Sequence, residues 1–325
     1  MRKRLITLLV AATATLALAG CTSPPQETPA APACVDSGDA SNAIAVTDAP
    51  GSDPVVTFTA PLPENSLQRT AVKTGEGETV NSNDTIEIAY AIYDATTGTK
   101  LGAIGFDNTA GRPLTVGEDV GGLEGIFSRG IACSTAGSRI ALAVPASDLA
   151  AAFPGEDLRD VTGHGIAIVL DIKNKLPKRA SGADQAPQEG FPLVTLDDKG
   201  APTVKIPSAD PPGELKIEVL KKGDGPVVTE NSSVTAQYQG VIWGTGKVFD
   251  QTWDTNSLMS LPLASTVKGF AQGLVGQTVG SQVVIVIPPA LGYGEGGNSA
   301  KAISGTDTLV FVVDILATGP VAAPN

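Results

Sequence analysis

The strongest constraint on the fold is an internal repeat. The run Lys73–Gly77 (Lys-Thr-Gly-Glu-Gly) recurs as Lys221–Gly225 (Lys-Lys-Gly-Asp-Gly), 148 positions later. Further along, Phe127–Ile131 (Phe-Ser-Arg-Gly-Ile) matches Phe270–Leu274 (Phe-Ala-Gln-Gly-Leu) at a spacing of 143. Two copies are too few for a stacked solenoid, so the repeat predicts two separate globular domains of about 110 residues each. The same registers also match Tyr90 with Tyr238, Gly98 with Gly246, Pro145 with Pro288 and Asp171 with Asp314.

The composition indicates a β-rich fold. Of the 325 residues, 37 are glycine and 24 are proline, charged residues make up only 17 %, and long helical periodicities are missing. Such a chain is expected to have many turns and an α+β or all-β fold. The formal net charge is −12. Because phosphate binding needs a basic face, nucleic acid is not an expected partner.

Individual elements can be assigned in the second copy. Ser233–Val241 alternates as a half-buried strand does, and Val283–Ile287 and Thr308–Leu316 are β-branched runs typical of central strands. Between the first two, apolar residues at i, i+3 and i+7 within Val267–Leu274 share one face of a short helix. We therefore predict an α+β fold in which each copy is a twisted antiparallel sheet wrapped over one short α-helix.

The N-terminus is a targeting segment rather than part of the fold. Arg2–Arg4 is basic, and Leu5–Leu18 is apolar but too short for a transmembrane helix. Leu18–Cys21 (Leu-Ala-Gly-Cys) resembles the bacterial lipobox, which implies cleavage before Cys21 and lipidation of its thiol. The alternative is an ordinary secretory signal with an incidental cysteine. Two acyl chains anchor a protein stably, so we expect an exported protein on the outer face of the cytoplasmic membrane.

Two cysteines remain after lipidation of the first. In an exported protein, Cys34 and Cys133 most simply form one disulfide. The alternative is a pair of buried free thiols.

The chain is predicted to consist of six segments, delimited by composition and by the repeat. They are the signal peptide (1–20), a Pro/Ala-rich tether with the start of the first domain (21–49), the first domain (50–175), a polar linker (176–200), the second domain (201–318) and a tail (319–325).

The second copy contains a run of glycine, aromatic and proline residues without reactive groups. Gly269–Leu274 (Gly-Phe-Ala-Gln-Gly-Leu) is followed by Ile287–Gly294 (Ile-Pro-Pro-Ala-Leu-Gly-Tyr-Gly). No strong nucleophile, metal cluster or phosphate loop accompanies them, so neither a metal nor another cofactor is expected. An apolar, aromatic site binds an apolar group but does not support hydrolysis or redox chemistry. Proline isomerisation is one reaction that it can catalyse.

These residues resemble the FKBP-type peptidyl-prolyl cis-trans isomerases. The resemblance covers roughly residues 211–316, and residues 50–175 show a weaker form of it. The motifs that carry it occur in the family's order. They are Val234–Gly240 (Val-Thr-Ala-Gln-Tyr-Gln-Gly), Gly246–Asp250 (Gly-Lys-Val-Phe-Asp), Thr266–Phe270 (Thr-Val-Lys-Gly-Phe), Ile287–Gly294 and Leu309–Phe311 (Leu-Val-Phe).

The resemblance implies a proline pocket and a set of roles. The backbone N–H of Val267 and the hydroxyl of Tyr293 would donate to the substrate carbonyl, and Asp250 would orient Tyr238. Rotation about a prolyl bond breaks amide resonance, at a cost of about 18–20 kcal/mol. Preferential binding of the twisted state therefore suffices, without acid, base or covalent steps. The implied catalytic residues are Tyr238, Phe249, Asp250, Val267, Phe270, Tyr293, Ile303 and Phe311.

Both copies depart from the family's pattern. The pocket floor is Phe270, where the family usually has tryptophan, and the loop from Asn298 to Ser304 lacks the double proline of many members. In the first copy, Leu101 and Gly102 stand where the second has phenylalanine and aspartate, and no tyrosine follows Pro145 at the matching position. We expect the first copy to be a degenerate FKBP-like domain that isomerises weakly or not at all.

Three functions follow from these observations. The leading one is a lipid-anchored peptidyl-prolyl isomerase that assists the folding of exported proteins. The second is a non-catalytic chaperone in which both domains bind clients, and the third is a surface scaffold. The expected partners are proline-containing unfolded polypeptides. Contact with the membrane is expected through the lipid alone, and the resemblance also implies macrolide binding.

Overall fold

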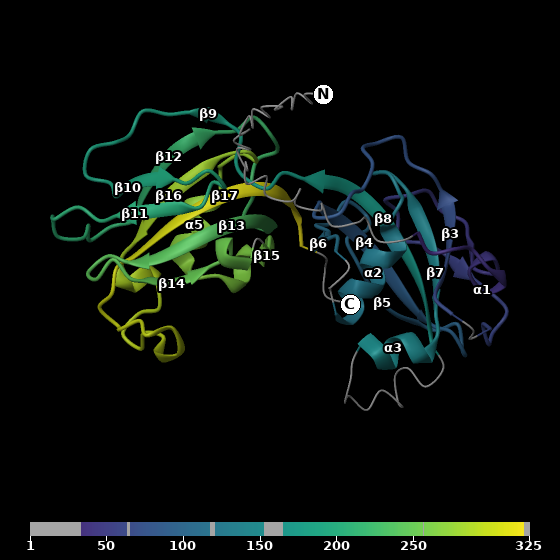
Figure 1. Ribbon diagram of the computed structural model, residues 1–325. Coiled ribbons are helices and arrows are strands. Elements are labelled where there is room, and N and C mark those ends of the chain that lie inside the picture. The colour runs from purple at the N-terminus through teal and green to yellow at the C-terminus, as the bar shows by residue number, and fades with distance from the viewer. Residues whose placement is uncertain (1–33, 64–65, 118–120, 153–164, 256, 322–325) are drawn as a thin grey trace, which may run out of the picture. The chain divides into compact units, whose positions relative to one another are not determined.

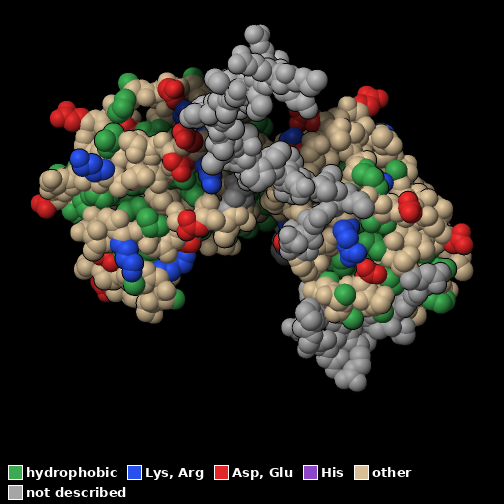
Figure 2. Space-filling model, viewed as in Figure 1, with side chains coloured by type: hydrophobic (Ala, Val, Ile, Leu, Met, Phe, Trp, Pro, Cys, Tyr) green, Lys and Arg blue, Asp and Glu red, His purple; other side chains and the backbone are tan. Residues whose placement is uncertain are grey.

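A computed structural model describes residues 34–63, 66–117, 121–152, 165–255 and 257–321 (Figure 1). Cys21 and the lipobox lie outside these residues. Within them, two antiparallel sheets each carry short helices, and no helix is long and apolar enough to cross a membrane. On the face shown in Figure 2, acidic and basic side chains are interspersed.

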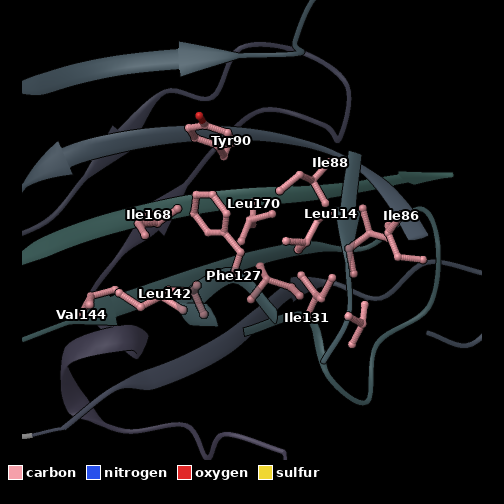
Figure 3. Packing of buried hydrophobic residues seen from close by; sticks show 14 of the residues in the cluster. Ile86, Ile88, Tyr90, Leu114, Phe127, Ile131, Leu142, Val144, Ile168 and Leu170 are labelled. Carbon is pink, nitrogen blue, oxygen red and sulfur yellow. The ribbon is translucent and has the colours of Figure 1, made fainter. Parts of the chain in front are cut away.

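The first sheet has the strand order β3-β7-β8-β4-β5, with β6 paired to β4 (Figure 1). Helix α2 (Gly122–Ile131) packs on its inner face, and α3 (Ala146–Ala152) follows β7. In Figure 3 the Phe127 ring of α2 points at the sheet and lies near Tyr90 and Leu170. The strands are β3 (Gln68–Lys73), β4 (Thr85–Asp94), β5 (Lys100–Ile104), β6 (Arg112–Thr115), β7 (Arg139–Val144) and β8 (Ile166–Leu176).

The second sheet has the order β14-β13-β17-β16-β12-β9, with β15 paired to β13. Apart from β9, this is the order of the first sheet, with each strand replaced by its counterpart in the repeat. Helix α5 (Lys268–Leu274) takes the place of α2. The strands are β9 (Ala183–Asp184), β12 (Lys216–Lys222), β13 (Ser232–Ile242), β14 (Val248–Gln251), β15 (Met259–Pro262), β16 (Gln282–Ile287) and β17 (Leu309–Pro320). Four short 3₁₀ turns complete this half: η1 (Trp253–Thr255), η2 (Leu263–Ser265), η3 (Pro289–Leu291) and η4 (Ser299–Lys301).

Two glycines let α5 approach the second sheet closely. A Cβ atom at Gly269 would lie 2.4 Å from Cγ2 of Ile287, and one at Gly273 would lie 2.6 Å from Cδ1 of Ile285. Glycine lowers the intrinsic stability of a helix, so packing holds α5 in place. The close approach buries Phe270 and Leu274 in the core between helix and sheet.

A second layer covers the outer face of each sheet. On the first sheet this layer is α1 (Asp39–Asn42) with the hairpin β1 (Ala45–Val46) and β2 (Val56–Thr57). On the second sheet it is the hairpin β10 (Leu193–Leu196) and β11 (Pro202–Lys205). Apolar side chains from this second hairpin and its flanks pack on β13, β16 and β17; they are Phe191, Val194, Val204 and Ile206.

Residues 176–200, predicted from their composition to be a polar linker, contain regular structure that packs on the second sheet. They contain β9 and β10, and the side chains of Phe191 and Val194 pack on the outer face of the sheet. Burial of these few side chains orders a segment that is otherwise polar and rich in proline.

A buried aspartate on each sheet accepts a backbone N–H from the segment that precedes that sheet. On the first sheet Asp171 accepts the backbone N–H of Gly51 at 2.6 Å and pairs with Arg139, whose side chain is fully buried. On the second sheet the counterpart Asp314 accepts the N–H of Ala180 at 2.7 Å and a hydrogen bond from Gln282 Nε2 at 2.7 Å. Desolvation by burial raises the pKa of the Asp314 carboxyl, although the hydrogen bonds from Ala180 and Gln282 and the nearby charges of Lys221 and Arg179 act against this rise.

The predicted disulfide between Cys34 and Cys133 is confirmed, and the alternative of two free thiols is wrong. The bond joins the start of the described chain to the residues that follow α2, across a separation of 99 residues. In the chain-entropy description, a cross-link over so long a loop stabilises the folded state by about 5 kcal/mol.

Candidate active site

Four aromatic rings form a compact cluster between the second sheet and α5. The ring centroid of Phe311 lies 5.1 Å from that of Phe270, 5.5 Å from that of Phe249 and 6.2 Å from that of Tyr238. Tyr238 and Phe270 meet edge to face at 6.3 Å. Edge-to-face contacts at these distances are favourable between aromatic rings. The cluster therefore forms a rigid apolar wall.

The strand register places these rings. Tyr238 lies on β13 and Phe311 on the neighbouring β17, while Phe249 comes from β14 on the other side of β13. Gly240 pairs with Phe311 on one side and with Asp250 on the other. A Cβ atom there would lie 2.5 Å from Cζ of Phe249, so only glycine lets that ring lie across β13. The sequence alone does not reveal this role of the glycine.

A polar edge borders the aromatic cluster. The hydroxyl of Tyr238 donates to Oδ2 of Asp250 at 2.9 Å, as predicted for a carboxylate that orients this tyrosine. Desolvation, and then the negative charge of Asp250, raise the pKa of Tyr238, so its hydroxyl stays protonated at physiological pH. Nζ of Lys301 donates to the same carboxylate oxygen. Sequence reasoning missed Lys301, because the residues next to it in the sequence do not show which distant side chain a loop lysine contacts.

The remaining predicted residues lie around the same cluster. Ile303 is buried, whereas Val267 and Tyr293 are half-buried and pack against the cluster. Val267 caps the N-terminus of α5, and no acceptor for its backbone N–H occurs among the described residues. Tyr293 follows η3 and is flanked by Gly294, whose φ is +62°. The structure thus brings all eight predicted site residues together.

The described residues contain no group of three or more His, Cys, Asp or Glu side chains placed to hold a metal ion. The available chemistry is that of an apolar pocket with hydrogen-bond donors at its edge. Such a site acts by binding a twisted amide more tightly than a planar one.

Sequence comparisons place this pocket in a known family. A family model described as FKBP-type peptidyl-prolyl cis-trans isomerase matches residues 225–316, which include all eight site residues. The chain is 35 % identical over 118 residues to the FK506-binding protein of Streptomyces anulatus, covering 95 % of that protein and 36 % of this chain. The chain belongs to the FKBP-type isomerase family.

Other proteins are similar to this FKBP-type isomerase over comparable lengths. A probable FK506-binding protein of Corynebacterium glutamicum is 33 % identical over 115 residues, which are 96 % of that protein and 35 % of this chain. Among solved structures, FkpA from Escherichia coli is similar at 27 % identity and a TM-score of 0.32, over 42 % of this chain and 55 % of that one.

The first sheet lacks most of the FKBP pocket. Tyr90 and Phe127 remain, with ring centroids 4.8 Å apart. Leu101, at the position of Phe249, is 48 % exposed, so it does not close a pocket. Arg112 forms an ion pair with Glu124. In the second copy, Met259 stands at the position of Arg112 and Val267 at that of Glu124. A charged pair therefore replaces apolar side chains at this place.

Proposed function

We propose that the second sheet and α5 form the catalytic domain of an exported peptidyl-prolyl isomerase. The observation that carries the proposal is the aromatic cluster around Phe311, bordered by the hydrogen bond between Tyr238 and Asp250. In this role the rings enclose the proline side chain and exclude water. An apolar environment favours the twisted amide, in which the carbonyl loses its resonance with nitrogen.

Two hydrogen-bond donors complete the proposed mechanism. The N–H of Val267 and the hydroxyl of Tyr293 bind the carbonyl that precedes proline. The N–H at the start of α5, which has no acceptor among the described residues, and the half-buried position of Tyr293 support these roles. Uncatalysed prolyl exchange takes tens of seconds and limits the folding of many proteins, so acceleration benefits chains that fold after export.

The proposed location is the outer face of the cytoplasmic membrane, through a lipid on Cys21. Two observations support it: the lipobox-like Leu18–Cys21 and the disulfide between Cys34 and Cys133. Disulfides persist in oxidising compartments outside the cytoplasm. In the producing cell, Cys21→Ser should abolish incorporation of labelled fatty acid and release the protein from membranes. Continued labelling of the variant would refute the anchor.

We further propose that the chain is a tandem of two FKBP-like domains, the first of them degenerate. The shared strand order of the two sheets supports the tandem, and the ion pair between Arg112 and Glu124 supports the loss of catalysis in the first. The first domain also exposes Leu101 and Ile104 on the edge strand β5, which favours a second role in binding clients without catalysis. Because two relatives are named FK506-binding proteins, we propose that the second pocket also takes such a macrolide.

Matched substitutions at equivalent positions of the two copies test the assignment. Asp250→Ala removes the carboxylate of the second copy, and Gly102→Ala alters the matching residue of the first, where a Cβ meets nothing within 4 Å. With the full chain and a short X-Pro peptide followed by exchange spectroscopy, Asp250→Ala should lower kcat/KM about tenfold. Gly102→Ala should leave it unchanged. Equal effects of both variants would refute catalysis by the second domain alone, and a wild-type chain without acceleration would leave client binding as the function.

A further inference from the structure

We propose that Lys301 is a positioning residue that holds the tip loop, residues 294–304, closed over the proline pocket by its ion pair with Asp250. The proposal rests on the proposed function of this pocket. Lys301 lies outside the FKBP motifs of the chain.

The ion pair links the loop to the polar edge of the pocket. Nζ of Lys301 and the hydroxyl of Tyr238 both donate to Oδ2 of Asp250. The side chains of Lys301 and Asp250 are 34 % and 28 % exposed, so water screens their attraction only in part. One carboxylate thus holds both a pocket wall and the loop.

The loop is built so that Lys301 and the pocket cap move together. Asn298 and Ile303 exchange two backbone hydrogen bonds, of 2.8 Å and 2.9 Å, and the side chain of Asn298 accepts the N–H of Lys301 at 3.2 Å. Gly297 has a φ of +60°, and a Cβ there would lie 2.3 Å from the carbonyl oxygen of Ile303. This short ring of bonds couples Lys301 to Ile303, which is only 4 % exposed and packs in the cluster that contains Phe311.

Release of the ion pair should therefore lower the fraction of molecules in which Ile303 covers the pocket. When only a fraction of a protein is competent to bind, the apparent dissociation constant rises by the reciprocal of that fraction. The chemistry of a bound peptide is unchanged by this equilibrium. The ion pair should accordingly affect KM, while kcat stays nearly constant.

The test compares three lysine variants of the full chain with an uncharged X-Pro peptide. Lys301→Met should raise KM about threefold to tenfold at low salt, with kcat nearly unchanged. Lys301→Arg should restore at least half of the lost kcat/KM, because a guanidinium also pairs with a carboxylate. Lys247→Met, on the exposed turn between β13 and β14, is the matched control and should match the wild type.

Salt provides a readout that a purely structural lysine would not give. From about 0.05 M to about 1 M NaCl, kcat/KM of the wild type should fall toward that of Lys301→Met, whose own value should stay flat. Hydrogen exchange of tip-loop amides, including that of Ile303, should accelerate in Lys301→Met by a similar factor.

Three results would overturn the proposal: an unchanged KM in Lys301→Met, an equal loss in Lys301→Arg, or a salt dependence that the methionine variant retains. The exchange measurement needs no catalysis. If the wild type does not accelerate prolyl exchange, the proposed function is wrong. The hydrogen-exchange rates of the tip-loop amides then still decide whether Lys301 holds the loop.

Discussion

Arg139 offers the sharpest test of how the covering layers are held. Its guanidinium donates to both oxygens of Asp171, at 2.6 Å and 2.8 Å, and to the carbonyls of Asp48 and Ser52, both at 2.7 Å. Arg139→Met keeps an unbranched apolar chain of similar length, but among the described residues it leaves Asp171, whose side chain is only 3 % exposed, with the N–H of Gly51 as its one donor. Removing one partner of a buried ion pair costs about 3–5 kcal/mol, a large share of the stability of an ordinary domain.

Arg139→Gln is the informative companion variant. On the second sheet a glutamine already occupies this place, and Gln282 donates to Asp314 at 2.7 Å. Glutamine at position 139 should keep one hydrogen bond to a charged acceptor, worth about 1.5–3 kcal/mol. We therefore expect it to recover about half of the stability that methionine loses.

Hydrogen exchange of the full chain separates the two halves. Amides of β7 and β8 should exchange faster in Arg139→Met, by an amount equivalent to about 3–5 kcal/mol. Both tryptophans, Trp243 and Trp253, lie in the second copy, so their fluorescence in urea serves as an internal control and should not change. A loss below about 1 kcal/mol, or equal losses for methionine and glutamine, would refute the reasoning.

Three further predictions concern the second domain. Gly273→Ala should lower the urea midpoint reported by tryptophan fluorescence, because a clash with Ile285 costs about 1–3 kcal/mol, more than the gain in helix propensity; an unchanged midpoint would show that α5 is loosely packed. Tyr293→Phe should lower kcat/KM about threefold to tenfold at an unchanged melting temperature; an unchanged rate would remove this hydroxyl from the mechanism. Asp314 has a pKa raised above 3.8, so its contribution to stability is present below that pH and is lost as the pH rises through the folded-state pKa. Asp314→Asn should therefore stabilise the domain more near pH 7 than near pH 4, and an equal gain at both pH values would contradict this.

The sequence correctly predicted the features that family motifs and residue counts define. The resemblance named all eight pocket residues, and the structure brings them together, with Tyr238 bonded to Asp250 as expected. Their catalytic roles remain predictions. The disulfide was also predictable, because Cys34 and Cys133 are the two cysteines that remain when Cys21 is assigned to the predicted lipobox.

Sequence reasoning failed where a contact depends on three-dimensional packing. Lys301 reaches Asp250 across 51 positions, and only the hydrogen bonds of the tip loop direct it there. The role of Gly240 became visible only from the approach of the Phe249 ring. The composition of residues 176–200 does not reveal strand β10, because polar and proline residues surround the few apolar side chains that the sheet beneath them orders.

The covering layers change where the chain can be divided. Each sheet is shielded by the residues that immediately precede it, so the smallest unit that hides its own apolar surfaces is longer than the 225–316 family match. A fragment starting at residue 200 would lack β9 and β10. Part of the apolar outer face of the second sheet, which includes Val241, Trp243 and Val284, would then be exposed to solvent. A fragment starting just after Leu176, where β8 ends, keeps that shield and the bond from Ala180. If the repeat arose by duplication, the duplicated segment included the hairpin that covers the outer face of the sheet. The new copy therefore did not have to evolve a separate covering layer.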